Sequence, residues 1–288
     1  MQAPRRVFLV PYRNRPSQRQ TLLAKLDEFL GDQDDWEIYF IHQCDHRPFN
    51  RGAMKNIGFL AMRRLYPNAY RNMTLIFHDV DTWPSWKNQF PYSTEDGVVS
   101  HYYGVKFALG GAFAIRGGDF ERTGGFANFW GWGLEDNVMH DRCAAAGLVI
   151  DRSTFFHIRD KAVRRGFDGF ERVSSRHEAA TYSYGQPDSF RDILGLRWRL
   201  DPGGMINVVA FSTTTSHRSH HYEAIDIRSG TRLRAQRRYL VPRRPLASAV
   251  RASRSSTSSR LSRQGRKRIK AELPAGGRRW PQRWNATM

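Results

Sequence analysis

The first half of the chain alternates between short apolar runs and longer amphipathic stretches. Apolar runs at residues 6–10, 36–42 and 74–78 predict three buried strands. Residues 21–30 and 53–65 carry apolar side chains at helical spacing, which predicts two helices between those strands. This strand–helix alternation is typical of a parallel sheet covered by helices, so we expect an α/β fold.

The same reasoning extends the fold into the second half of the chain. Residues 112–115 predict a strand after two glycines, and residues 137–146 predict a helix with Val138 and Cys143 facing inward. Further apolar runs predict strands at residues 148–150, 206–211 and 222–227, the last two joined by a polar loop.

Polar residues follow the first and third predicted strands, at the ends where open α/β sheets bind ligands. Arg13 and Arg15 follow the first, and Asp79-Val80-Asp81 follows the third. Two acids one residue apart can reach one crevice, where a divalent cation bridges protein to diphosphate. A turn or a helix cap remains the alternative, because Asp is common in both.

Residues 130–136 alternate tryptophan with glycine and then reach two acids, in the order Trp-Gly-Trp-Gly-Leu-Glu-Asp. Glycine permits close approach of the backbone to a ligand, and tryptophan offers a flat apolar surface with one polar group. A carboxylate behind such a surface, at Glu135 or Asp136, can take a proton from a bound hydroxyl. A core position for Trp132 is the alternative.

A single histidine lies about twenty residues further on. His157 alone is more typical of a structural histidine, but with Asp81 it becomes a candidate ligand for Mn²⁺, which accepts imidazole and carboxylate. The polar, charged residues 159–176 that follow predict a lid that orders when substrate binds.

Composition separates the chain into two parts. The formal net charge is +19, yet residues 232–288 hold seventeen Lys or Arg and one acid, which is +16 and leaves +3 for residues 1–231. We therefore expect a catalytic domain at 1–231 and a basic, low-complexity, disordered tail at 232–288. The tail is either solvated or an interaction segment in which Trp280 and Trp284 stack on nucleic acid bases or anchor at a membrane surface.

Cysteine content and hydropathy indicate the cellular compartment. The two cysteines, Cys44 and Cys143, are expected to be buried free thiols, with a single bridge as the alternative. The apolar run at residues 7–10 is too short for a signal peptide, and no stretch approaches the roughly 18 apolar residues of a membrane span. We expect a soluble, cytoplasmic protein.

Six segments together carry a family resemblance across roughly residues 7–227. They are VPYRNR (10–15), FNRGAMKNIGF (49–59), FHDVDTWP (77–84), GGAFAI (110–115), FERTGGFANFWGWGLED (120–136) and HIRDK (157–161). In order and spacing this set resembles the β-1,4-galactosyltransferase family. The resemblance implies a fold of glycosyltransferase A type, with a mixed, mostly parallel central sheet that binds a UDP-sugar.

The resemblance also implies roles for individual residues. Asp136 would be the catalytic base, with Glu135 beside it helping to hold the sugars, and Asp81 and His157 would bind Mn²⁺. The donor would be held by residues near the strand ends and the tryptophan loop, namely Pro11, Arg13, Arg15, Phe49, Arg51, Asp79, Val80 and Trp132. The acceptor would meet Gly133, Leu134 and Asp136.

Three positions differ from the family pattern. Thr154 replaces a methionine that serves several members as a third metal ligand, and Leu134 replaces a glycine on the acceptor side. Ala108 replaces the aromatic residue that in many members limits the donor's 2-position, which leaves room for an N-acetyl group.

The expected function is an Mn²⁺-dependent, inverting transfer of galactose from UDP-galactose to a GlcNAc- or xylose-like acceptor, forming a β-1,4 linkage. A UDP-N-acetylgalactosamine transferase of the same family is the second candidate. A nucleic-acid-binding protein acting through the tail and an inactive sugar-binding relative remain alternatives.

Overall fold

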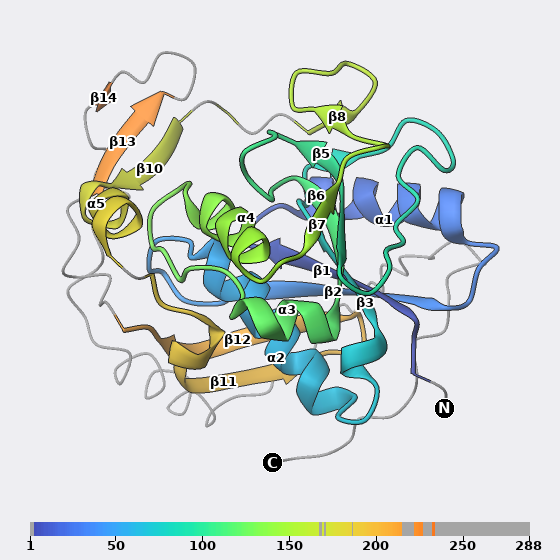
Figure 1. Cartoon of the computed structure of the whole chain (residues 1–288), viewed down its shortest axis with the longest axis horizontal. Helices are drawn as coiled ribbons and strands as arrows, with labels where there is room; N and C mark the ends of the chain where they lie inside the picture. Colours follow the sequence, from blue (N-terminus) through green and yellow to red (C-terminus); the bar gives the residue numbers. More distant parts are fainter. Residues whose placement is uncertain are drawn as a thin grey trace, which may run out of the picture.

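A nine-stranded mixed sheet forms the centre of the computed structural model, which describes residues 3–166, 169, 171–185, 187–214, 222–226 and 232–233 (Figure 1). Eight strands follow one another in the order β11 (Leu194–Leu200), β12 (Met205–Ser212), β2 (Trp36–Gln43), β1 (Arg6–Tyr12), β3 (Thr74–His78), β6 (Ala112–Arg116), β5 (Val98–Gly104) and β7 (Val149–Asp151). The ninth, β8 (Phe156–His157), pairs with β5 beyond the point where β7 ends.

Strand directions match the predicted mixed architecture. Strands β2, β1 and β3 run parallel, as the alternating pattern indicated, and β12 joins β2 in the same direction. Strand β6 runs antiparallel to both β3 and β5, and β11 runs antiparallel to β12. The expected α/β class with a mixed, mostly parallel sheet is therefore confirmed in its central strands.

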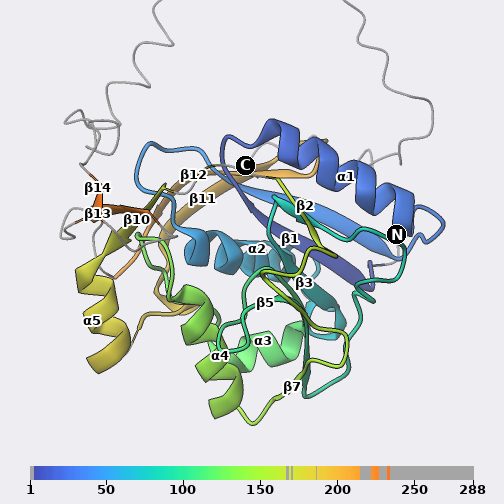
Figure 2. The same ribbon diagram turned by 90° about the horizontal axis from the view of Figure 1, so that it is seen from above.

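Helices cover both faces of the sheet (Figure 2). Helix α1 (Pro16–Leu30) packs on one face, while α2 (Arg51–Leu65), α3 (Gly117–Thr123) and α4 (Glu135–Ala145) pack on the other. Adjacent residues of β1 point to opposite faces: Phe8 joins the apolar cluster under α1, and Leu9 joins the cluster under α2. Two short 3₁₀ turns, Tyr70–Asn72 and Phe190–Asp192, complete the second cluster.

Smaller elements surround one end of the sheet. Strands β10 (Glu171–Ser175), β13 (Tyr222–Asp226) and β14 (Arg232–Leu233) form a three-stranded sheet. Helix α5 (Arg176–Tyr184) follows β10 in the sequence and lies beside this sheet (Figure 1). Strands β4 (Thr82–Trp83) and β9 (Arg164–Arg165) form a two-stranded ribbon. The two last predicted strands thus exist but belong to different sheets, because β13 pairs with β10 rather than with β12. The predicted disordered tail began at residue 232, but Arg232 and Leu233 form β14, so its first two residues were wrongly assigned; residues 234–288 lie outside the described residues.

Helices α1, α2 and α4 each begin earlier than predicted, because their first residues carry no apolar side chains at helical spacing. Helix α2 begins at Arg51, since the side chain of Asn50 accepts a hydrogen bond from the Ala53 backbone N–H at 2.8 Å. Helix α1 begins at Pro16, a residue favoured in the first helical turn. Helix α4 begins at Glu135, so both acids of the motif lie in its first turn.

The two cysteines are both free thiols, and they differ in solvent exposure. Cys143 is buried in α4 as predicted, but Cys44 is exposed, so the prediction that it is buried was wrong. Cys44 follows the last residue of β2, where the chain leaves the sheet toward solvent. In the part of the chain that the structure describes, every helix is too short or too polar to cross a bilayer.

Candidate active site

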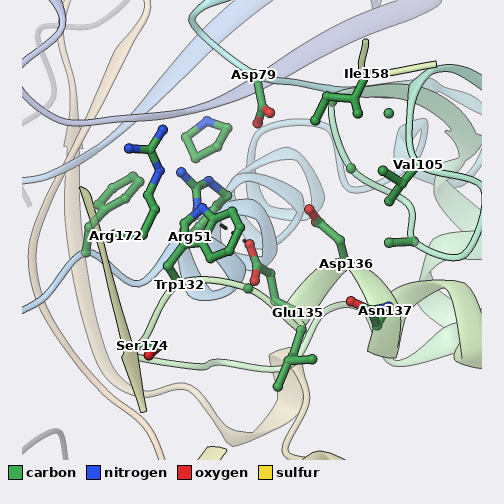
Figure 3. A pocket seen from close by; sticks show the side chains of 18 of the residues that line it. Arg51, Asp79, Val105, Trp132, Glu135, Asp136, Asn137, Ile158, Arg172 and Ser174 are labelled. Carbon is green, nitrogen blue, oxygen red and sulfur yellow. Dashed lines mark ion pairs between the residues drawn. The ribbon is translucent and has the colours of Figure 1, made fainter. Parts of the chain in front are cut away.

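One cavity of about 880 Å³ opens where β1 and β3 end and α4 begins (Figure 3). Its volume lies in the range of ligand sites of roughly 300–1,000 Å³. It is lined by all the site residues expected from the sequence except His157: Pro11, Arg13, Arg15, Phe49, Arg51, Asp79, Val80, Asp81, Trp132, Gly133, Leu134, Glu135 and Asp136. The fold therefore brings these residues, far apart in the chain, to one hollow; their individual roles stay predictions.

The acidic wall of the cavity continues β3. The Asp79 backbone N–H donates to the Gly111 carbonyl at 2.8 Å, which ties the end of β3 to the start of β6. Burial raises the pKa of Tyr103 to about 12, Arg165 opposes this shift, and Asp79 and Asp81 add to it. Asp79, Asp81 and Arg165 are thus close enough to Tyr103 for their charges to shift the pKa of its hydroxyl.

His157 lies on β8, in register with Gly104 of β5, and is exposed. Its Nδ1 atom accepts from the Arg159 backbone N–H at 3.3 Å. Across the described residues, no group of three or more His, Cys, Asp and Glu side chains is arranged to hold a metal ion. Carboxylate oxygens at a strand end nevertheless fit a hard divalent cation whose remaining ligands come from substrate phosphates and water. Asp81, which lines the cavity beside Asp79, suits such a shared site, whereas His157, the other predicted ligand, lies outside the cavity lining.

Another part of the cavity lining is basic and aromatic. The Arg13 guanidinium lies 5.0 Å from the centroid of the Phe49 ring, and that of Arg51 lies 5.6 Å from it. Arg13 also donates to the Arg47 carbonyl at 2.6 Å, and burial lowers the pKa of Arg13. Guanidinium groups fixed in this way suit the phosphates of a nucleotide, while the ring offers a surface for its base.

The chain enters α4 through two residues in the left-handed region. Gly133 has φ 94° and Leu134 has φ 71°, a conformation that is uncommon for a leucine. This sharp turn places Glu135 and Asp136 at the helix N-terminus and inside the cavity rim (Figure 3). Backbone strain at the edge of a cavity is typical of functional sites.

Two cations of α2 face the two acids of α4. Arg51 and Lys55 are one helical turn apart; Arg51 Nη1 lies 3.6 Å from Glu135 Oε1, and Lys55 Nζ lies 2.6 Å from Asp136 Oδ1. Sequence reasoning did not identify Lys55, because the predicted helix began at residue 53 and left Arg51 outside it, whereas in the structure both lie on α2.

Glu135 has an unusual environment for a carboxylate. It is 2 % exposed, and burial followed by the negative charge of Asp136 raises its pKa to about 7, against the opposing charges of Arg51 and Lys55. Among the described residues, nothing donates a hydrogen bond to its Oε2 atom, although that atom is buried. A buried acceptor without a donor suits a ligand hydroxyl.

The tryptophan loop divides its two rings between core and cavity. Trp130 is buried and stacks on Phe211 with 5.3 Å between ring centroids, whereas Trp132 is 41 % exposed at the cavity rim. The alternative of a core role therefore applies to Trp130 and not to Trp132. Glu178 of α5 accepts the backbone N–H groups of Trp130 and Gly131, a contact that the sequence did not indicate.

Comparison with known families assigns the chain. Sequence models of the "N-terminal region of glycosyl transferase group 7" and of the "N-terminal domain of galactosyltransferase" match residues 2–92 and 86–163, together more than half of the chain. The chain belongs to the β-1,4-galactosyltransferase family. Together the two matches include the cavity-lining residues from Pro11 to Ile158, whereas those from Arg165 onward lie outside them.

Individual members of the β-1,4-galactosyltransferase family are similar over about half of this chain. Human β-1,4-galactosyltransferase 4 is 34% identical over 175 residues, which are 54% of this chain and 49% of the human protein. Mouse β-1,4-galactosyltransferase 7 is 29% identical over 178 residues, 56% of this chain and 53% of the mouse protein. The chain thus spans about half the length of the curated relatives that it matches.

A solved structure shows that the fold is shared. The catalytic domain of Drosophila β-1,4-galactosyltransferase 7, in complex with xylobiose, aligns with a TM-score of 0.54 at 20% identity, over 75% of this chain and 97% of that one. A mutant of the same enzyme with manganese, UDP-Gal and xylobiose aligns equally well. The predicted fold of glycosyltransferase A type is confirmed.

Proposed function

We propose that this protein is an inverting hexosyltransferase that moves galactose from UDP-galactose to a hydroxyl of a sugar acceptor, forming a β-1,4 linkage. One observation carries the proposal: a single cavity joins the acidic end of β3, the arginine-rich end of β1 and the carboxylate of Asp136. Family membership supports the same chemistry.

Asp136 is the proposed general base. The acceptor hydroxyl transfers its proton to this carboxylate while its oxygen bonds to the anomeric carbon of the donor. The bond from that carbon to UDP breaks, and UDP leaves with the electron pair. A single displacement on an α-linked donor from the opposite face gives a β-linkage, so the reaction inverts configuration.

The charge on the leaving diphosphate needs compensation. Arg13 and Arg51 lie on the cavity wall next to Phe49 and would bind the nucleotide there. Asp81 and His157 are proposed to hold a divalent cation, Mn²⁺ by similarity to the Drosophila complex, which would neutralise phosphate charge when bound. Glu135 would orient a sugar hydroxyl through its unpaired Oε2 atom.

The identities of the donor and acceptor sugars are also part of the proposal. Ala108 lines it and is buried, and this small side chain leaves N-acetylgalactosamine as a second candidate donor beside galactose. A xylose-like or GlcNAc-like acceptor is proposed because similar proteins are β-1,4-galactosyltransferases 4 and 7, and the structure of the latter holds xylobiose.

One assay tests the proposal. Purified protein is incubated with Mn²⁺, xylose or GlcNAc glycosides and a panel of UDP-sugars, with UDP release and product linkage as readouts. We expect UDP release above the acceptor-free rate with UDP-galactose or UDP-N-acetylgalactosamine. Failure of every donor to support transfer would contradict the enzyme proposal, and a product with retained α configuration would contradict the mechanism.

A further inference from the structure

Lys55 is a buried cation in direct contact with the proposed base. It is 2 % exposed, its Nζ atom lies 2.6 Å from Asp136 Oδ1, and it also lies 4.4 Å from the centroid of the Phe126 ring. A lysine held this deep requires a compensating charge, because an unpaired ammonium removed from water is strongly destabilising. Asp136 supplies that charge.

The other oxygen of Asp136 lies against the loop before β6. A Cβ atom added at Gly110 would come within 2.3 Å of Asp136 Oδ2, so that oxygen packs over the glycine. The Asp136 backbone carbonyl accepts from the Leu109 N–H at 2.9 Å. Main chain and side chain of Asp136 are therefore fixed by separate elements, the loop and α2.

Exposure differs across this ion pair. The Asp136 side chain is 25 % exposed and lines the cavity, whereas Lys55 is enclosed and does not line it. In Figure 3 the Asp136 carboxylate points into the cavity, and the neighbouring Glu135 points toward Arg51. Only the carboxylate of the Lys55–Asp136 pair can meet a substrate.

We propose that Lys55 is a positioning residue: its ammonium holds Oδ1 of Asp136 so that Oδ2 is presented to the acceptor hydroxyl. The inference rests on the proposed function, since it assigns a task within that reaction. The proton of the hydroxyl passes to Oδ2 while the hydrogen bond from Lys55 to Oδ1 persists, so the carboxyl group need not rotate during transfer. Fixing a base in its reactive orientation is a recognised source of rate.

Substitution of Lys55 by methionine tests the proposal, because methionine keeps much of the stem and removes the charge. Lys55→Met should lower kcat about 10- to 100-fold, while KM for the UDP-sugar stays within about threefold, since Lys55 does not touch the donor. Lys55→Arg keeps the charge and should retain more turnover than Lys55→Met. Equal loss in both variants would overturn the proposal.

A double-mutant cycle separates positioning from mere packing. In an Asp136→Asn background the base is already absent, so adding Lys55→Met should leave the residual rate unchanged. A purely structural Lys55 would instead lower that rate again by its full factor, which would overturn the inference. This cycle also decides the matter if Lys55→Met alone melts at a lower temperature.

A matched control and the wild type keep the outcomes distinct. Lys25→Met removes an exposed ion pair with Glu28 on α1, away from the cavity, and should leave both kcat and Tm unchanged. Wild-type protein without turnover on any UDP-sugar would contradict the proposed function and this inference together. Wild-type turnover with an unaffected Lys55→Met would contradict the inference alone.

Discussion

At the scale of single residues, the site is defined by charges that compensate one another inside the cavity. Burial lowers the pKa of Arg51, but Glu135, Asp79, Asp136 and Asp81 together raise it above the usual range of a guanidinium. Arg51 thus interacts with the charges of both acidic segments, the end of β3 and the start of α4. Substitution of the individual carboxylates tests the separate role proposed for each.

Removal of the proposed base should affect turnover and not folding. Asp136→Asn keeps the shape of the side chain and should lower kcat roughly 10²-fold or more, the scale of a lost general base. Initial rates of UDP release and a thermal melt measure both properties. Asp141→Asn on the exposed side of the same helix serves as the control, and full activity of Asp136→Asn would remove this residue from the mechanism.

The proposed cation site predicts a binding defect. Asp81→Ala removes a carboxylate at the end of β3 and should abolish the gain in UDP affinity that Mn²⁺ provides, because metal and diphosphate share ligands. Calorimetric titration of UDP with and without Mn²⁺ measures this gain. Equal affinity gains in wild type and variant would place the cation elsewhere.

Glu135 predicts a pH dependence of stability. Its pKa is about 7 when folded, above the ordinary 4.5, so its contribution is fully present below pH 4.5 and is lost as pH rises through 7. Glu135→Gln lacks this ionisation. Between pH 5 and 8 the wild type should therefore lose about 1–3 kcal/mol of stability relative to the variant. Denaturant melts at several pH values measure the difference, and parallel curves for the two proteins would contradict the assigned pKa shift.

At the scale of elements, the proposed base depends on how α2 packs against the loop that leads into α4. A Cβ atom at Gly52 would lie 1.9 Å from the Ala127 carbonyl oxygen, so the backbones must separate in Gly52→Ala. We expect a loss of about 1–3 kcal/mol of stability, as for other overpacked sites, together with lower turnover. Thermal melts and initial rates test this.

Helix α3 offers the matched glycine. At Gly118 an added Cβ would meet its nearest atom, the Arg71 carbonyl oxygen, at 3.6 Å, an ordinary contact. Gly118→Ala should be neutral or stabilising by up to about 1 kcal/mol, since alanine favours helices. Equal destabilisation by Gly52→Ala and Gly118→Ala would argue against a tight contact at Gly52.

Sequence patterns predicted those elements whose apolar side chains are all buried together. Strand β3 was predicted with its observed bounds because all five of its residues are buried. Strand β5 was not identified, since it buries Ser100 and His101 among its apolar residues. His101 is accommodated by the carbonyls of Tyr103 and Gly110, and burial lowers its pKa to about 4. Such compensation is invisible in a hydropathy pattern.

Cavity residues that belong to sequence motifs could be predicted, whereas residues that act through long-range contacts could not. The family segments include Arg51, Asp79 and Asp136, which line the cavity. Lys55 and Glu178 were missed because each acts on a partner 81 or 47 residues away, Asp136 and Gly131 respectively. No spacing rule connects residues at those separations; only the packing of α2 and α5 does.

At the scale of the whole molecule, the basic tail and the catalytic domain are expected to act separately. Strand β14 still pairs with β13, and Ile225 of β13 lines the cavity, so a truncation must keep residues up to 233. A protein of residues 1–233 should transfer sugar at close to the full rate. It should also lose salt-dependent binding to a polyanion such as heparin or single-stranded DNA, because about +15 of the net charge lies beyond that point.

Two measurements on the full-length and shortened proteins test whether catalysis and polyanion binding belong to different parts of the chain. The UDP-release assay reports on catalysis, and binding titrations at several salt concentrations report on the tail. Loss of transfer in the shortened protein would tie the tail to catalysis. Salt-dependent polyanion binding that survives truncation would locate the binding surface within residues 1–233.

The outer neighbour of β2 in the sheet comes from the far end of the described chain. Strand β12 pairs with β2 from Met205↔Phe40 to Val208↔Gln43, although the region that matches the family models ends at residue 163. A fragment cut at that boundary would leave the hydrogen-bonding groups of a long, apolar strand open to other chains, which favours aggregation. We therefore expect that residues 2–163 do not fold on their own, because the sheet is completed only when β12 pairs with β2.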